Sequence, residues 1–236
     1  MVCISAPLRT GLLEFGGNPR SSMRSIDRTS FTGWSGYMRG TELATEDLVV
    51  RPLDAQTWPA FADLAGRHNG VFGGCWCTWF HCHPDPPERA ELGNREFKHA
   101  LVTKGRAHAA LVFRGDEAIA WAEYGPVAEL PNIHHRKQWE LETTQQPNYR
   151  ITCLFVDRRF RRNGLAAVAV RGALALIADA GGGLVEAYPH DLPEEKKISS
   201  SFLYNATRTM YERLGFTYQR PKGAGNCVMT IVVDGH

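Results

Sequence analysis

The chain has 236 residues, 43% of them hydrophobic, and is long enough to bury the core of a single domain. Its formal net charge of +2 is too small to indicate a nucleic-acid-binding surface. The longest apolar stretch, residues 165–178, contains Arg171 and is shorter than the ~20 residues of a membrane helix, so no membrane partner is expected.

Residues 1–40 differ in composition from the rest of the chain. They are rich in Ser, Thr, Gly and Arg, and lack both hydrophobic periodicity and the apolar core of a secretory signal. We therefore expect a disordered extension followed by one domain over residues 41–236. An organellar transit peptide and an upstream start, with Met38 as the true beginning, both remain open. The six cysteines without a signal peptide suit a reducing cytoplasm.

Between residues 47 and 124, the apolar pattern predicts a strand, two helices and a β-hairpin. The turn of the hairpin is expected at residues 114–117, and Gly125 and Pro126 end its second strand. The predicted bounds are 47–53 for the strand, 56–67 and 86–104 for the helices, and 108–113 and 118–124 for the hairpin.

Residues 73–84 combine three cysteines, two histidines and several aromatic residues. Cys75, Cys77 and Cys82 raise the possibility of a metal or redox site, although Cys-x-Cys is tighter than the spacing of ordinary zinc ligands. The other two interpretations are an aromatic wall of a pocket and plain core packing.

A strand-helix-strand unit is predicted over residues 151–188. An apolar strand at 151–156 is followed by a buried helix at 165–178 and a second strand at 184–188. Gly164 would lie at the N-terminus of the helix, where free N–H groups and the helix dipole favour an anion. Small residues there let a ligand approach the main chain, so the segment 161–166 predicts a phosphate cradle.

Two motifs resemble those of the GCN5-related N-acetyltransferases, the GNAT superfamily. The first is Arg161-x-x-Gly164-x-Ala166 after a strand. The second is Asn205, then Tyr211, then Gly215-Phe216, predicted on an amphipathic helix with Ser200 or Ser201 as N-cap and Phe202 in its apolar stripe. The two motifs occur in the order of the family.

The resemblance implies an α/β protein with the GNAT fold: a mixed central sheet of six to seven strands, flanking helices and a βαβ acyl-CoA-binding core. It also implies acetyl-CoA as acyl donor, with the pantetheine arm on the strand, the pyrophosphate on the cradle and the four arginines 158, 159, 161 and 162 near the remaining phosphate. The implied coenzyme contacts are Leu154, Phe155, Val156, Arg161, Arg162, Asn163, Gly164, Leu165, Ala166 and Asn205.

The resemblance makes Tyr211 the candidate acid that protonates the departing thiolate, and core packing is the alternative for this residue. The family's glutamate at the start of the fourth strand is missing, so Glu123 and Glu186 are candidates for the general base. His134, His135 or a water relay could serve instead.

Acceptor contacts are expected from Trp76, Trp79 and Tyr124, and from the long insertion at residues 127–149. The predicted function is transfer of an acetyl group to a primary amine of a small molecule or peptide. A non-catalytic acyl-CoA-binding module and a metal or redox protein are the alternatives. No metal is expected if the protein is an acetyltransferase or an acyl-CoA-binding module. A homodimer is considered because dimers are common among such proteins.

Overall fold

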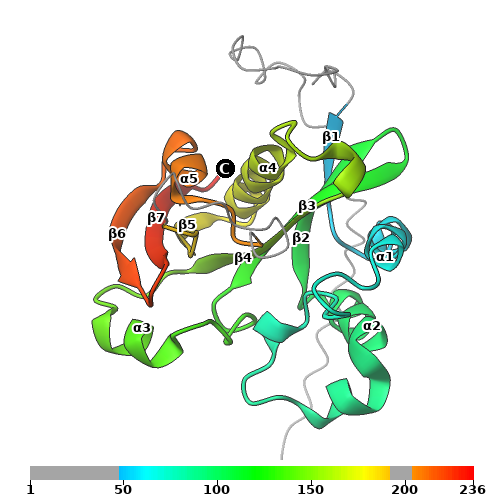
Figure 1. Cartoon of the computed structure of the whole chain (residues 1–236), viewed down its shortest axis with the longest axis horizontal. Helices are drawn as coiled ribbons and strands as arrows, with labels where there is room; N and C mark the ends of the chain where they lie inside the picture. The colour runs from blue at the N-terminus through cyan, green and yellow to red at the C-terminus, as the bar shows by residue number, and fades with distance from the viewer. Residues whose placement is uncertain (1–47, 192–203) are drawn as a thin grey trace, which may run out of the picture. The chain divides into compact units, whose positions relative to one another are not determined.

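The computed structural model describes residues 48–191 and 204–236, which form one seven-stranded mixed sheet with flanking helices (Figure 1). The predicted extension, residues 1–40, lies outside the described residues. The strands are β1 Leu48–Pro52, β2 His108–Arg114, β3 Glu117–Pro126, β4 Tyr149–Val156, β5 Gly182–Ala187, β6 Thr217–Lys222 and β7 Asn226–Asp234, arranged in the order β1-β2-β3-β4-β5-β7-β6.

The helices are α1 Trp58–Arg67, α2 Pro87–Thr103, α3 Arg136–Glu142, α4 Leu165–Asp179 and α5 Arg208–Arg213, with short 3-10 turns at Trp79–His81 and Arg158–Phe160. None of the helices in the described ranges is long and apolar enough to cross a membrane. The predicted elements from β1 to β5 are confirmed to within a few residues, and α2 carries a kink at Gly93, whose φ is 74°.

Every neighbouring pair in the sheet is antiparallel except β4 and β5. The parallel pairing of β4 with β5 joins Tyr149–Ile151 to Val185–Ala187 and then stops. Beyond Ile151, the edge of β4 that faces β5 has no partner strand in the described residues. The two strands are therefore paired over only three residues each.

Alternating residues of the central strands build two cores, one on each face of the sheet. Trp121 and Phe155 pack with α1, α2 and the 71–82 loop. Ala122 and Leu154, their neighbours in sequence, pack with α4 and α5 on the opposite face. The two faces therefore receive different functional residues from the same strands.

The second motif is less helical than predicted. Asn205 and Ala206 precede α5, because Ala206 has a φ of 54° and Thr207 is extended, so the helix begins only at Arg208. The predicted caps Ser200 and Ser201, together with Phe202, lie outside the described residues.

Gly172 allows α4 to lie close against β1. A Cβ added at Gly172 would lie 2.5 Å from Val50 Cγ1, and valine is a stiff side chain that yields little. We expect Gly172→Ala to lower the free energy of unfolding by about 1–3 kcal/mol, measured by urea denaturation. The control is Gly66→Ala in α1, where a Cβ meets nothing within 4 Å.

The double variant Gly172→Ala/Val50→Ala should be less destabilised than the sum of its two single variants, because the shortened side chain removes the clash. Strict additivity would show that contact with Val50 is not the cause.

Candidate functional site

The loop after β4 carries the predicted phosphate cradle. Gly164, with a φ of 71°, is the N-cap of α4, and the space where its Cβ would lie is open to 4 Å. The amides of Ala167 and Val168 already bond to the Gly164 carbonyl, whereas the first N–H groups of a helix have no partner in a preceding turn. The segment predicted from its sequence thus forms a helix N-terminus with room for an anion.

The four arginines of this loop are not equivalent. Arg159 hydrogen-bonds the buried carboxylate of Asp157 at 2.8 Å and pairs with Glu117, so its charge is already compensated. Arg161 Nε lies 3.3 Å from the Val156 carbonyl oxygen. Of the four candidate arginines for the coenzyme's remaining phosphate, Arg159 is therefore the least suited, because two carboxylates already compensate its charge.

One backbone group contacts the edge of β4 beyond Ile151. Leu154 N–H, on the unpaired edge of β4, donates to the carbonyl oxygen of Tyr204 at an N···O distance of 2.6 Å. This N–H belongs to the stretch expected to hold the pantetheine arm. A ligand that hydrogen-bonds Leu154 N–H must therefore displace the Tyr204 carbonyl.

A small pocket lies beside this contact. Its walls come from the 79–81 turn, the insertion before β4, the end of β5, the start of the second motif and the turn between β6 and β7. The lining residues are Phe80, Ile133, His134, Tyr188, Tyr204, Asn205, Lys222 and Asn226. Asn205, a predicted coenzyme contact, is thus part of this pocket.

The predicted acceptor residues divide between different places. Trp79 stacks on His134, which lines the pocket, with ring centroids 4.3 Å apart. Trp76 packs instead near Trp58 and Phe61, on the α1 side. Tyr124 lies in the opposite core with α4, so the structure does not bring it together with Trp79. Of the three residues, Trp79 alone adjoins the pocket.

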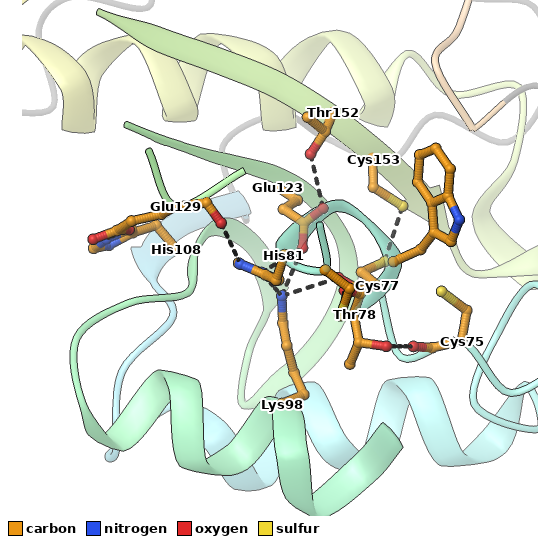
Figure 2. Close-up of polar contacts among 12 residues, drawn as sticks. Cys75, Cys77, Thr78, His81, Lys98, His108, Glu123, Glu129, Thr152 and Cys153 are labelled. Atoms are coloured by element: carbon orange, nitrogen blue, oxygen red, sulfur yellow. Dashed lines mark hydrogen bonds and ion pairs between the residues drawn. The ribbon is translucent and has the colours of Figure 1, made fainter. Parts of the chain in front are cut away.

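Glu123 belongs to a buried polar network rather than to an accessible proton-transfer site (Figure 2). Its carboxylate accepts from Lys98 Nζ at 2.6 Å and from the Thr152 hydroxyl at 2.8 Å. Burial alone would raise its pKa, but the Lys98 ammonium and His81 lower it to about 2. A carboxylate with this pKa accepts protons poorly at neutral pH, so the geometry does not support Glu123 as general base.

His81 completes the Glu123 network. Burial and the Lys98 charge lower its pKa, which favours a neutral ring. If Nδ1 donates to the Glu129 carbonyl at 2.9 Å, Nε2 is free to accept from Lys98 at 2.9 Å. Lys98 then donates to Glu123, to His81 and, at 3.4 Å, to the Cys77 carbonyl oxygen, and the network ties α2 to β3 and β4.

Glu186 also has structural partners. Its Oε2 accepts from Trp139 Nε1 at 2.7 Å and from the Tyr188 hydroxyl at 2.6 Å, and the residue is 3% exposed. These bonds hold α3 against β5. The hydrogen bonds of Glu186 therefore explain how the insertion packs on the sheet. None of its contacts supports a role as the general base.

Tyr211 lies in the same core as Leu154, with its ring packed edge-on against Phe216 at 4.9 Å. Burial, followed by the nearby Cys153, raises its pKa, so the phenol stays protonated at neutral pH. The predicted acid must be protonated before it can donate a proton, and Tyr211 meets this requirement. Its buried position agrees equally well with a role in core packing alone.

The cysteines pair differently from the predicted group. Cys77 Sγ lies 2.9 Å from Cys153 Sγ, as Figure 2 shows, whereas Cys82 donates to the Thr78 carbonyl. The candidate metal ligands among the described residues are Cys77, Glu123 and Cys153. A tetrahedral zinc site with Zn–S bonds of about 2.3 Å separates its sulfurs by about 3.8 Å. The short sulfur contact and the engaged Glu123 oxygens thus disfavour a metal.

Sequence reasoning missed Lys222, Tyr188 and Tyr204, which line the pocket. Lys222 ends β6 and is only 3% exposed. A lysine next to a glycine turn gives no signal of such burial, and Lys222 finds its acceptor, the His134 carbonyl oxygen, in a distant segment.

Comparison with known proteins identifies one family. The description "Acetyltransferase (GNAT) family" matches residues 71–216. A comparison with curated proteins gives no match.

Solved structures with a similar fold include the polyamine N-acetyltransferase of Drosophila melanogaster, which is 16% identical, with 80% of this chain and 100% of that chain covered and a TM-score of 0.44. The PaiA N-acetyltransferase of Thermoplasma acidophilum, solved in complex with coenzyme A, is 12% identical, with 78% and 98% covered and a TM-score of 0.43.

The buried Lys98–Glu123 pair leads to a stability prediction. Lys98→Met leaves a buried carboxylate without its main partner, so we expect the free energy of unfolding at pH 7 to fall by about 3–5 kcal/mol. The double variant Lys98→Met/Glu123→Gln removes both charges and should recover most of this loss. Equal destabilisation of the single and double variants, measured by urea denaturation, would argue against the pair.

Proposed function

The chain belongs to the GNAT family of acetyltransferases, and we propose that it transfers an acetyl group from acetyl-CoA to a primary amine of a small molecule or peptide. The observation that carries this proposal is the arrangement around the unpaired edge of β4. The helix N-terminus at Gly164 follows β4 in the chain, the Leu154 N–H lies on this edge, and Tyr204, whose carbonyl oxygen accepts from it, lines the pocket. Their proposed roles are an anion cradle, a donor for a carbonyl oxygen and an acceptor pocket.

In the proposed reaction, the amine nitrogen attacks the thioester carbon. The new C–N bond forms as the C–S bond breaks, the amine loses a proton, and the thiolate gains one. Leu154 N–H would donate to the thioester oxygen once the Tyr204 carbonyl has moved away, which stabilises the charge that develops on that oxygen. Leu154 to Val156 and the segment from Arg161 to Ala166 are the proposed donor-binding residues.

We propose His134 as the proton acceptor for the amine, in preference to Glu123 and Glu186. His134 lines the pocket, and burial, followed by the charge of Lys222, lowers its pKa. A neutral imidazole can accept a proton at physiological pH. A water molecule could relay the proton if the acceptor amine lies beyond direct reach of the ring.

The cytoplasm remains our proposed location. It suits the five described cysteines, which are all free thiols.

The cradle is tested by placing a negative charge in it. Gly164→Asp should weaken binding of acetyl-CoA by at least about tenfold, because a carboxylate at the helix N-terminus competes with and repels the phosphates. Gly105→Asp is the matched control, since Gly105 also has a positive φ, of 64°, and open space around its Cβ. Unchanged binding of acetyl-CoA to the Gly164 variant, measured by calorimetry, would rule out this cradle.

The acid is tested by Tyr211→Phe, which removes only the hydroxyl. We expect kcat to fall by about 10²-fold with the KM for acetyl-CoA unchanged, because the departing thiolate loses its proton donor. Tyr218→Phe, in the strand after the same helix, is the control and should leave kcat unchanged. An unaltered kcat in the Tyr211 variant would assign the residue to the core.

If the wild-type protein binds acetyl-CoA but acetylates no amine in a broad panel, the chain is a binding module. Release of free coenzyme A thiol reports the reaction in every case.

A further inference from the structure

The charge at the pocket is positive, and it comes from a buried lysine. Lys222 lines the pocket and is 3% exposed. Its Nζ donates to the His134 carbonyl and lies 4.4 Å from the centre of the Tyr188 ring. An ammonium group has three N–H donors, and within the described residues the His134 carbonyl is its one oxygen acceptor. Lys222 therefore keeps donor capacity for a ligand.

The charged groups around Lys222 do not balance. Glu186 is the nearby anion, and it already accepts hydrogen bonds from Trp139 and Tyr188. Arg150 is a second buried cation: it bonds the Leu130 carbonyl, stacks on an indole and forms no ion pair in the described part of the chain.

Arg220, the remaining cation near Lys222, is paired with Glu142 at 3.3 Å. His134 favours its neutral form, as described above. Among the described residues, two buried cations thus face one buried carboxylate, which leaves an excess of one positive charge in this part of the chain. Burying an uncompensated charge is costly, and an anionic group in the pocket would offset that cost.

The polar lining of the pocket suits a carboxylate. Asn205 and Asn226 contribute side-chain amides next to Lys222, and Phe80 and Tyr204 contribute aromatic walls. Tyr204 also joins the pocket to β4, since its carbonyl oxygen contacts Leu154 N–H. The pocket has a volume of about 10 Å³, room for about one water molecule, so a carboxylate can reach Lys222 only if the pocket widens. Movement of Tyr204, which the thioester contact with Leu154 N–H also requires, would widen it toward the proposed position of the thioester.

We propose that the acceptor is an amine that also carries a carboxylate, such as an amino acid, and that Lys222 binds this carboxylate. This inference rests on the proposed function for the identity of the amine as acceptor. A polyamine would add positive charge to a pocket that already has an excess, so acceptors of that class should bind poorly.

The test compares molecules that differ at the carboxylate position. Each of several amino acids is paired with its carboxamide and its decarboxylated amine, and binding to the full-length protein with coenzyme A is measured by calorimetry. Hydrogen bonds to charged groups predict that at least one amino acid binds about tenfold or more tightly than both neutralised forms. Equal binding within every set, or a preference for the amines, would overturn the proposal.

Variants separate Lys222 from the rest of the pocket. Lys222→Met should abolish the preference for the carboxylate and Lys222→Arg should keep part of it, whereas Lys104→Met, at an exposed position, should leave it intact. A preference that survives Lys222→Met in folded protein overturns the assignment. If Lys222→Met does not fold, the preference of the wild type must decline above about pH 8, to which burial lowers the pKa of Lys222.

Acetylation of the same molecules is scored separately by thiol release. Selective binding of carboxylates without acetylation would contradict the proposed acetyltransferase activity and leave the anion site standing. Acetylation of the carboxamides and decarboxylated amines at the same kcat/KM as of their amino acids would contradict the role of Lys222 in acceptor choice and leave the activity standing.

Discussion

The short parallel pairing of β4 with β5 governs the candidate site. A strand in the middle of a sheet normally satisfies its backbone groups on both edges, and a buried N–H without a partner is costly. Here the pairing stops after Ile151 and Ala187, so the second half of β4 must find other acceptors along one edge. Leu154 finds the Tyr204 carbonyl. The same divergence gives the anion cradle and the pocket access to one strand.

Two buried lysines show how partners decide the role of a charge. Lys98 donates to a carboxylate and an imidazole, so its charge is compensated within the protein, in a network that connects α2, β3 and β4. Lys222 contacts a carbonyl and an aromatic ring, while the carboxylate of Glu186, which influences its pKa, accepts hydrogen bonds from other residues. The first arrangement is explained by folding alone. The second leaves donor capacity for the proposed carboxylate, and that difference distinguishes a structural lysine from a proposed binding lysine.

The sequence predicted those features that depend on local patterns. The β4-α4-β5 unit and the glycine at the start of α4 follow from apolar runs and helix-capping preferences, and the structure confirms them. The prediction that Asn205 lies on the last helix was wrong, because the backbone turns at Ala206 and the helix begins after it. The apolar stripe in the sequence does not reveal this turn. Glu123 and Glu186 looked available because Lys98 and Trp139, their partners, are distant in sequence. The sequence alone could have excluded one combination. Neighbouring residues of a strand face opposite sides of the sheet, so Glu123 and Tyr124 could not both belong to one site.

The hydrogen bond from Leu154 to Tyr204 bears on how strongly any acyl donor is held. A ligand carbonyl that takes this N–H gains one hydrogen bond and frees another carbonyl, so the exchange itself contributes little to affinity. The tightness of binding must then come mainly from the phosphate end of the coenzyme. The protein would discriminate poorly among acyl groups by affinity, and selection among them would arise in the rate of the chemical step rather than in occupancy.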